Sequence, residues 1–262
     1  MGGVLSERAG VVNIALEGMM LAGCFASVAA AVSTGSPLIG VLAGIAAGAV
    51  VGLLHAVFTL KLRVAHILSG VALNLGLLGF TSFAVRLYPG GVLDTVATVS
   101  DGVTTTLAFL SVAALWFVLY KTALGLRIRA IGENPGAARS AGVPVGAIRY
   151  GAVIVSGALA GLGGVALALA GLGAFRQNMT SGRGYVALAA VIFGRWNPVG
   201  AACAAFVFAL GDALQQALQT DGRLQIPPDF LALLPYVLTL LALAFMGNKT
   251  AAPAALGVDD AT

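Results

Sequence analysis

Charged and metal-binding residues are scarce in this chain, which narrows its possible functions. Aspartate, glutamate, lysine and arginine together make up 9% of the 262 residues, whereas about 25% is usual in a soluble domain. Cys24 and Cys203 lie within apolar runs and lack the spacing of metal ligands, so neither a metal site nor a disulfide is expected. The sequence has no phosphate-binding glycine loop, no carboxylate pair within one apolar run and no nucleophile beside a base, so it indicates no enzyme.

Long uncharged stretches fill most of the chain instead. Apolar residues make up 59% of it, and its mean hydropathy is +0.99. Four stretches carry no Asp, Glu, Lys or Arg: 18–60, 64–85, 150–175 and 230–248. About 20 apolar residues in a helix cross the roughly 30 Å of hydrocarbon in a bilayer, and these stretches lack the alternation of a transmembrane barrel. The sequence therefore predicts an all-α, polytopic transmembrane helical bundle, with 1–262 forming a single membrane domain.

The apolar runs predict about seven or eight spans. Seven are expected near residues 11–33, 37–60, 65–88, 104–121, 147–175, 198–217 and 229–247. A further apolar piece, 185–194, is too short to cross the bilayer as a straight helix. We expect this piece to be a half-helix or a re-entrant segment that lines protein rather than lipid.

The basic residues predict which side each loop faces. The loop 121–149 holds five of them against Glu133 alone, and basic loops stay in the cytoplasm, so this loop is expected inside. Alternation of the spans then places the turn 61–63 inside and the loop 89–103 outside. It also places Arg176 and Arg183 outside, against the preference of basic residues for the cytoplasmic side. Because the basic residues are few and separated by apolar spans, topology accounts for the formal net charge of +4, and no nucleic-acid partner is expected.

Glycines recur at a spacing that suits close helix packing. In the second predicted span, Gly40, Gly44, Gly48 and Gly52 fall every four residues on one helical face. Small residues at this spacing let membrane helices approach closely. Residues 157 and 161 repeat the glycine spacing in the span after the basic loop. We expect both faces to serve packing between helices rather than a subunit-specific interface.

A few polar residues interrupt the apolar runs. Glu17 is the only charge between residues 10 and 60, and it follows Asn13 by about one turn. Because an unpaired carboxylate within a bilayer costs about 2.5–3.5 kcal/mol, Glu17 must pair, meet a helix N-terminus or line a cavity. Two interpretations stay open for Glu17, and equally for Asn74 and Asp212: a hydrogen bond that locks helices together, or a place on a translocation path. His55 and His66 are expected to be hydrogen-bonded helix residues.

The basic loop contains signals for a short helix. Asn134 suits the N-cap and Pro135 the first helical position, while Gly142 and Pro144 end the helix. So short a helix gains little stability from propensity alone. We therefore expect it to be held by docking against another element or protein.

Three stretches resemble one known family. They are SERAGVVNIALEG at 6–18, RAIGENP at 129–135 followed by Ala138 and Arg139, and GRGYVALAAVIFGRWNP at 182–198. Together they are similar to the integral membrane permeases of nucleoside and simple-sugar ABC importers, within the ribose and branched-chain amino-acid permease superfamily. Members of this family usually have another hydrophobic helix before the first of these stretches, so a helix ahead of residue 1 is expected to be missing.

The resemblance implies a function and its partners. It implies a permease subunit in the cytoplasmic membrane that passes nucleosides or simple sugars, hydrolyses nothing and binds no cofactor. A separate cytoplasmic ATPase would use ATP, an external binding protein would deliver the solute, and a related second permease would complete the pair. The expected contacts with the ATPase are Gly132, Glu133, Asn134, Pro135, Ala138 and Arg139. The candidates for the translocation path are Asn13, Glu17 and Asn74.

Two other functions remain open from the residues alone. Glu17 and the intramembrane Asp212 also suit an ion- or proton-coupled carrier that works without an ATPase. Such carriers commonly contain inverted repeats, and no convincing repeat is found in this sequence. A structural membrane subunit of a larger complex is the third possibility, and it predicts no transport in any reconstitution.

Overall fold

The fold is a bundle of apolar helices. The computed structural model describes residues 1–88, 93–94, 98–221 and 252–258. Six of the described helices are long and apolar enough to cross a membrane. They are α2 (Leu16–Thr34), α3 (Pro37–Ala56) continued by the π-helical turn η1 (Val57–Lys61), α4 (His66–Arg86), α5 (Asp101–Lys121), α8 (Val145–Val165) continued by the π-helical segment η3 (Ala166–Leu172), and α10 (Pro198–Asp221). The all-α, polytopic bundle is confirmed.

Shorter elements connect these spans. They are the helices α1 (Gly2–Arg8), α6 (Ala123–Glu133), α7 (Pro135–Ser140) and α9 (Arg183–Phe193), and the two-residue strands β1 (Leu93–Asp94) and β2 (Ala174–Phe175). The strands pair antiparallel, with residue 93 opposite 175 and residue 94 opposite 174. The predicted span 229–247 lies outside the described residues.

The predicted first span, 11–33, begins later than expected. Helix α2 starts at Leu16, and the preceding residues 9–15 form turns and extended chain after the unpredicted helix α1. Gly10 turns the chain with φ at +89°, a left-handed conformation that glycine adopts without steric cost. The apolar run continued through this break, so hydropathy alone did not reveal it.

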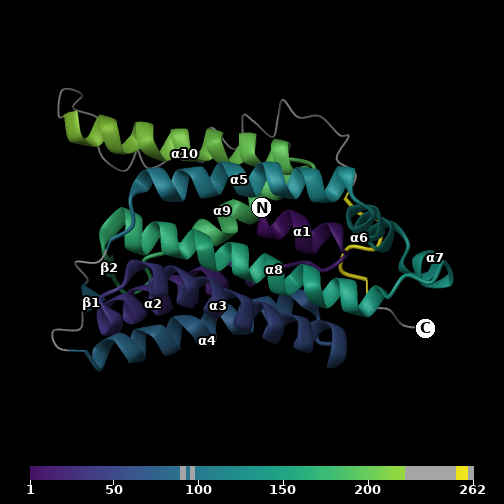
Figure 1. Ribbon diagram of the computed structural model, residues 1–262, viewed down its shortest axis with the longest axis horizontal. Helices are drawn as coiled ribbons and strands as arrows, with labels where there is room; N and C mark the ends of the chain where they lie inside the picture. Colours follow the sequence, from purple (N-terminus) through teal and green to yellow (C-terminus); the bar gives the residue numbers. More distant parts are fainter. Residues whose placement is uncertain (89–92, 95–97, 222–251, 259–262) are drawn as a thin grey trace.

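The two ends of the bundle are easily told apart. Figure 1 places α6 and α7 at one end and β1 and β2 at the other. The described segment 252–258 joins the α6 end, because the Ala255 N–H donates to the Gly132 carbonyl at 2.8 Å. The predicted loop 121–149 thus resolves mainly into α6 and α7. We call this end the α6–α7 end, and the positive charge of the loop predicts that it faces the cytoplasm.

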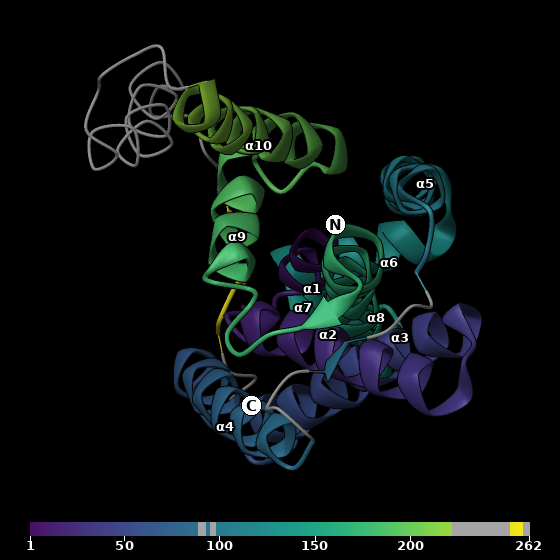
Figure 2. The same ribbon diagram turned by 90° about the vertical axis from the view of Figure 1, so that its left-hand side faces the viewer.

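Helices α2, α3 and α8 pack backbone to backbone along the glycines. A Cβ atom added at Gly48 would collide with the Gly157 carbonyl oxygen, and one added at Gly23 would collide with the backbone of Gly161. This close approach, which we call the glycine seam, gains dispersion contacts that larger side chains would prevent. The glycine faces therefore pack helices within this chain, as expected. Helices α5 and α10 lie on the other side of the molecule from α4 (Figure 2).

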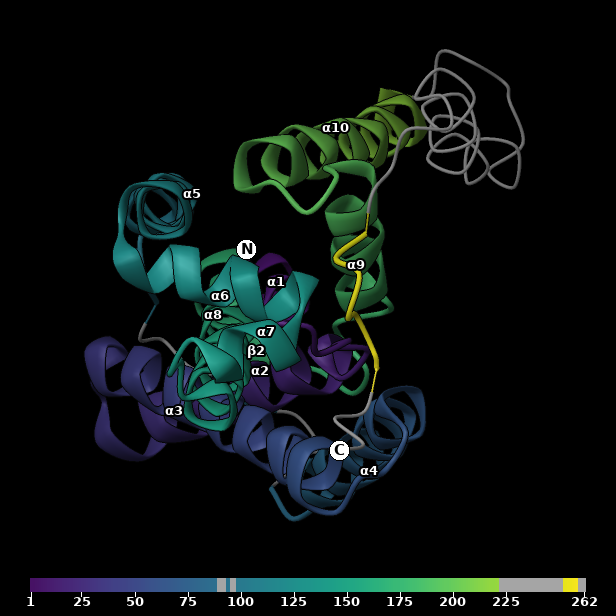
Figure 3. The same cartoon turned by 90° about the vertical axis from the view of Figure 1, so that its right-hand side faces the viewer.

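Helix α9, with 11 residues, is too short to cross a bilayer. The chain leaves β2 at the end opposite to α6 and α7 and returns through the non-helical residues 176–182 to the start of α9, beside Glu17. That level is about halfway along α8, because Ala160 packs against the hydrophobic cluster that contains Leu16, and Ala160 lies 15 residues after Val145 and 12 before Leu172. In Figure 3, α9 stands between α10 and the level of α2. The short apolar piece is thus a half-helix. Arg183, which was predicted outside, is the first residue of this helix and lies within the bundle, beside the residues that bind Glu17.

Candidate functional site

Glu17 binds the N-terminus of the half-helix α9. Its Oε1 accepts hydrogen bonds from the Thr180 hydroxyl at 2.6 Å and the Gly182 N–H at 2.8 Å, and its Oε2 accepts one from the Gly184 N–H at 2.6 Å. A helix N-terminus leaves N–H groups unsatisfied and carries partial positive charge, so it stabilises a carboxylate. A Cβ at Gly184 would collide with the Glu17 backbone, so only glycine permits this approach. These contacts match the first of the two interpretations of Glu17, hydrogen bonds that lock helices together; we call them the helix lock.

Asn74 joins the same site from α4. Its Oδ1 accepts from the Gly18 N–H at 2.8 Å, and its Nδ2 donates to the Ile14 carbonyl and to the Tyr185 hydroxyl, each at 2.9 Å. These bonds connect α4, the start of α2 and α9. The sequence did not single out Tyr185 for a role, because an exposed tyrosine in a half-helix has no distinctive spacing.

An open pocket of about 230 Å³ lies beside these bonds. We call it the α2–α4–α9 pocket. Its lining residues are Glu17, Gly18, Leu21, Asn74, Leu75, Leu78, Asn178, Thr180, Ser181, Gly182 and Tyr185. Two of the predicted path residues, Glu17 and Asn74, therefore meet at one cavity.

The third predicted path residue, Asn13, lies elsewhere. It is fully buried, and its Nδ2 donates to the Ser156 hydroxyl at 2.9 Å, on α8. Its Oδ1 has no hydrogen-bond partner within the part of the chain that the structure describes. Asn13 is not among the residues that line the α2–α4–α9 pocket, so its contacts are those of a helix-packing residue.

Both histidines hold the non-helical peptide before α2. His55 Nε2 lies 3.0 Å from the Val12 carbonyl oxygen, and the Val12 N–H donates to His66 Nδ1 at 3.2 Å. His55 Nδ1 lies 2.9 Å from the Ser69 hydroxyl. The expected role of hydrogen-bonded helix residues is confirmed. The pair satisfies both backbone polar groups of Val12 where no helix can do so.

A second carboxylate, Glu7, holds the other end of α9. Trp196 lies in the turn after α9, and its Nε1–H donates to Glu7 Oε2. Arg8 Nε donates to the Trp196 carbonyl at 2.7 Å. Residues 195 and 196 both have φ near +54°, an uncommon conformation for side chains of this size. No sequence pattern indicates this contact, because Glu7 and Trp196 are 189 residues apart.

Glu7 lies in α1, outside the six spans, and burial raises its pKa from 4.5 to about 7 although the Trp196 and Asn13 hydrogen bonds oppose the shift. The folded protein therefore keeps a proton that the unfolded chain releases. The contribution of Glu7 to the free energy of unfolding is fully present below about pH 4.5 and is lost as the pH rises to about 7. The loss is roughly 3 kcal/mol, at 1.36 kcal/mol per pH unit. We expect the melting temperature of the purified protein to fall between pH 4.5 and 7.5, and Glu7→Gln to flatten this fall. The same slope in both proteins would contradict the assignment.

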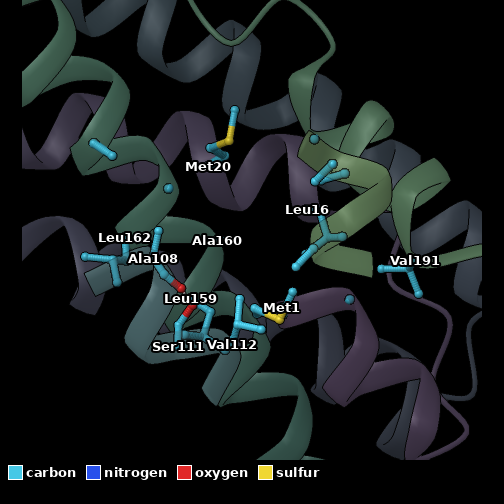
Figure 4. Close-up of a pocket in the computed structure, with 18 of the residues that line it drawn as sticks. Met1, Leu16, Met20, Ala108, Ser111, Val112, Leu159, Ala160, Leu162 and Val191 are labelled. Atoms are coloured by element: carbon cyan, nitrogen blue, oxygen red, sulfur yellow. Dashed lines mark hydrogen bonds between the residues drawn. The ribbon is translucent and has the colours of Figure 1, made fainter. Parts of the chain in front are cut away.

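A larger cavity of about 410 Å³ lies among α1, α5, α8, α9 and α10. Figure 4 shows it surrounded by Met1, Leu16 and Met20 together with α5 and α8 side chains such as Val112 and Leu159. Of the lining residues that the structure describes, none is Asp, Glu, Lys, Arg or His, and the polar side chains are those of Thr104 and Ser111. Such a lining gives a polar solute little compensation for lost water. The smaller α2–α4–α9 pocket is the better polar site.

The predicted coupling residues fall into an exposed set and a buried set. Asn134 caps α7, with its Oδ1 accepting from the Ala137 N–H at 2.9 Å, and Pro135 follows at the first position as expected. Glu133, Asn134 and Arg139 are exposed. Gly132 and Ala138 are buried, and a Cβ at Gly132 would collide with the Arg8 carbonyl. The buried pair lies behind the exposed residues, and the predicted contacts with an ATPase remain a prediction.

Two features behind the coupling segment escaped sequence analysis. Helix α6 is capped by Thr122, whose hydroxyl accepts from the Gly125 N–H at 3.1 Å. The segment 252–258 lies against its end, with Gly257 N–H donating to the Gly10 carbonyl at 3.0 Å. The Ala254 N–H also donates to Glu133 Oε2 at 3.4 Å. Gly132 lies against the Arg8 carbonyl, and Arg8 donates to the Trp196 carbonyl, so parts of the three stretches that share the family resemblance lie next to one another.

Comparison with known proteins gives consistent relatives. The pattern of the family described as "Branched-chain amino acid transport system / permease component" matches residues 1–243. The guanosine ABC transporter permease protein NupQ of Bacillus subtilis is 38% identical, covering 98% of this chain and 90% of that protein. The nucleoside ABC transporter permease protein NupC of Lactococcus lactis is 37% identical with the same coverage, and a putative glucose ABC transporter permease of Haloferax volcanii is 34% identical. No solved structure matches the chain.

Proposed function

We propose, from the premise that this chain belongs to the family of branched-chain amino acid transport system permease components, that it is the permease subunit of an ABC importer for nucleosides. The observation that carries the substrate class is the likeness to a guanosine permease and a nucleoside permease along 98% of the chain. Simple sugars are the second candidate, because a putative glucose permease is 34% identical.

A separate ATPase drives the importer through the α6–α7 segment. Glu133, Asn134 and Arg139 are exposed there and form its contact surface, with Pro135 beside them. Gly132 and Ala138 fix the segment from behind. When the ATPase subunits close, they pull this segment and switch the packed helices between inward and outward openings. The chain needs no nucleotide site or cofactor of its own for this role.

The translocation path passes the α2–α4–α9 pocket. Glu17 and Asn74 line it, whereas Asn13, the third predicted path residue, bonds to Ser156 on α8. An external binding protein delivers the solute, and a related second permease completes the path. The protein works in the cytoplasmic membrane, and it transports without catalysing a reaction itself.

The coupling role is tested by replacing Glu133 and Arg139 together with alanine. We expect uptake of labelled guanosine by vesicles that contain the whole importer to fall at least about tenfold, because the exposed contact with the ATPase is lost. The amount of protein inserted in the membrane should stay the same. The matched control is Lys61→Ala, which removes an exposed charge at the last residue of η1, just before the turn into α4.

Uptake at the parent rate by the double variant would refute the assigned surface. The same vesicles separate the carrier hypothesis from the importer. Uptake without ATPase and binding protein, driven by an ion gradient, would favour a carrier. Failure to transport any nucleoside or sugar with all subunits present would favour a structural subunit.

A further inference from the structure

The α2–α4–α9 pocket has polar groups that the fold does not use. The Tyr185 hydroxyl accepts from Asn74, but its own proton has no acceptor among the residues that the structure describes. The Asn178 side chain likewise has no hydrogen-bond partner within the described ranges, and both residues are exposed and line the pocket. Polar groups at this depth need water or a polar ligand as partner, since lipid offers none.

Charge in the pocket is one-sided. Among the described residues that line the pocket, Glu17 is the single Asp or Glu, and none is Lys, Arg or His. Arg183 follows the lining residue Gly182, but its guanidinium donates to the Met179 carbonyl at 3.2 Å. The N–H groups of Gly182 and Gly184 at the start of α9 donate to Glu17. A phosphate or carboxylate of a solute would therefore meet a like charge and would find these donors occupied.

The apolar part of the lining suits the remaining surface of a small solute. Leu21, Leu75 and Leu78 contribute to the wall beside the polar groups. Small-molecule sites commonly combine such apolar walls with a few placed polar groups. At about 230 Å³ the pocket is smaller than the roughly 300 Å³ and more of sites for drug-sized ligands. It therefore suits a small solute held on one side by this chain.

We propose that the α2–α4–α9 pocket is a solute-contact site that takes uncharged, hydroxyl-bearing solutes of the nucleoside class and rejects anionic ones. The Tyr185 hydroxyl donates to the solute, and the Asn178 amide donates to it or accepts from it. Glu17 keeps anions out while it holds α9. This site rests on the proposed nucleoside function, and it adds Tyr185 and Asn178 as residues that bind the solute. Tyr185 also bonds to Asn74 on α4, whereas the Asn178 side chain makes no such bond within the described residues.

The test measures tritiated guanosine uptake by vesicles that contain the whole importer, with loaded binding protein at saturating concentration. Saturation removes the binding protein's own affinity from the result. Tyr185→Phe and Asn178→Ala are each expected to lower the uptake rate about three- to tenfold, the loss of one hydrogen bond to the solute. Tyr150→Phe, a partly buried tyrosine of α8, is the matched control and should keep the parent rate. Guanosine 5′-monophosphate should not be taken up.

Each outcome decides one part of the proposal. Because Tyr185 also bonds to Asn74, Asn178→Ala gives the cleaner result if Tyr185→Phe reduces the amount of folded protein. Parent rates in both pocket variants, with the parent importing guanosine, would overturn the site and leave the proposed function standing. No guanosine uptake by the parent would overturn the proposed function and the site with it. Uptake of the monophosphate at a similar rate would overturn the rejection of anions.

Discussion

Gly157→Leu is expected to remove nearly all correctly folded protein from the membrane. A Cβ at this position would already collide with the Gly48 carbonyl, and a leucine side chain would force α3 and α8 apart along the glycine seam. Overpacking of a tight core costs about 1–3 kcal/mol and occasionally more, and here the obstacle is backbone, which cannot rotate away. The measurement is the yield of monodisperse protein after extraction, monitored through the fluorescence of a fused fluorescent protein.

The same helix supplies the control. Gly151 is exposed on α8, and a Cβ there would meet no atom within 4 Å. Gly151→Leu adds the same apolar volume and improves helix propensity by up to about 1 kcal/mol, so its yield should equal or exceed that of the parent. A monodisperse Gly157→Leu protein in parental yield would show that the seam does not hold these helices at the described distance.

Glu17→Ala is expected to abolish uptake. The change removes three acceptor contacts at the start of α9 and leaves the N–H groups of Gly182 and Gly184 without them. Hydrogen bonds to a charged group contribute about 1.5–3 kcal/mol each, and no helix can supply replacements at this point. We expect a lower melting temperature together with uptake at background level.

Two further variants separate charge from shape. Glu17→Gln keeps the size but leaves one acceptor oxygen and turns an NH2 group toward N–H donors, so uptake should be intermediate. Asp212→Asn removes an exposed carboxylate from the apolar helix α10 and should retain most of the uptake. Equal uptake by the parent and Glu17→Ala would show that neither the helix lock nor the path depends on this carboxylate.

Local signals predicted much of the fold. The apolar runs indicated the six described spans, and the residues around Asn134 indicated the start of α7 through its cap. These features depend on neighbouring residues in the chain. The break at 9–15 was missed, because the histidines that hold Val12 come from α3 and α4. The short helices α1 and α6 were missed because they are brief and because their packing partners lie far away in sequence.

The candidate site was predicted only in part for the same physical reason. Glu17 attracted attention as a lone charge in an apolar run, and Asn74 as a polar residue in another. Their common pocket and the role of Tyr185 depend on how far residues 176–182 return into the bundle. No hydropathy pattern encodes that depth. Glu7 was overlooked because a carboxylate next to Arg8 looks like an ordinary surface charge, whereas the fold buries it.

The two carboxylates that hold α9 also fix its length. Glu17 binds before the first turn and Glu7 binds after the last, and the helix between them has 11 residues, or about 16 Å at 1.5 Å per residue. One inserted residue would lengthen α9 by about 1.5 Å and rotate one end by about 100° relative to the other. Either Gly184 or Trp196 would then lose its carboxylate. A change in the number of residues in this segment is therefore expected to disrupt the fold more than replacement of an exposed residue such as Val186 or Ile192.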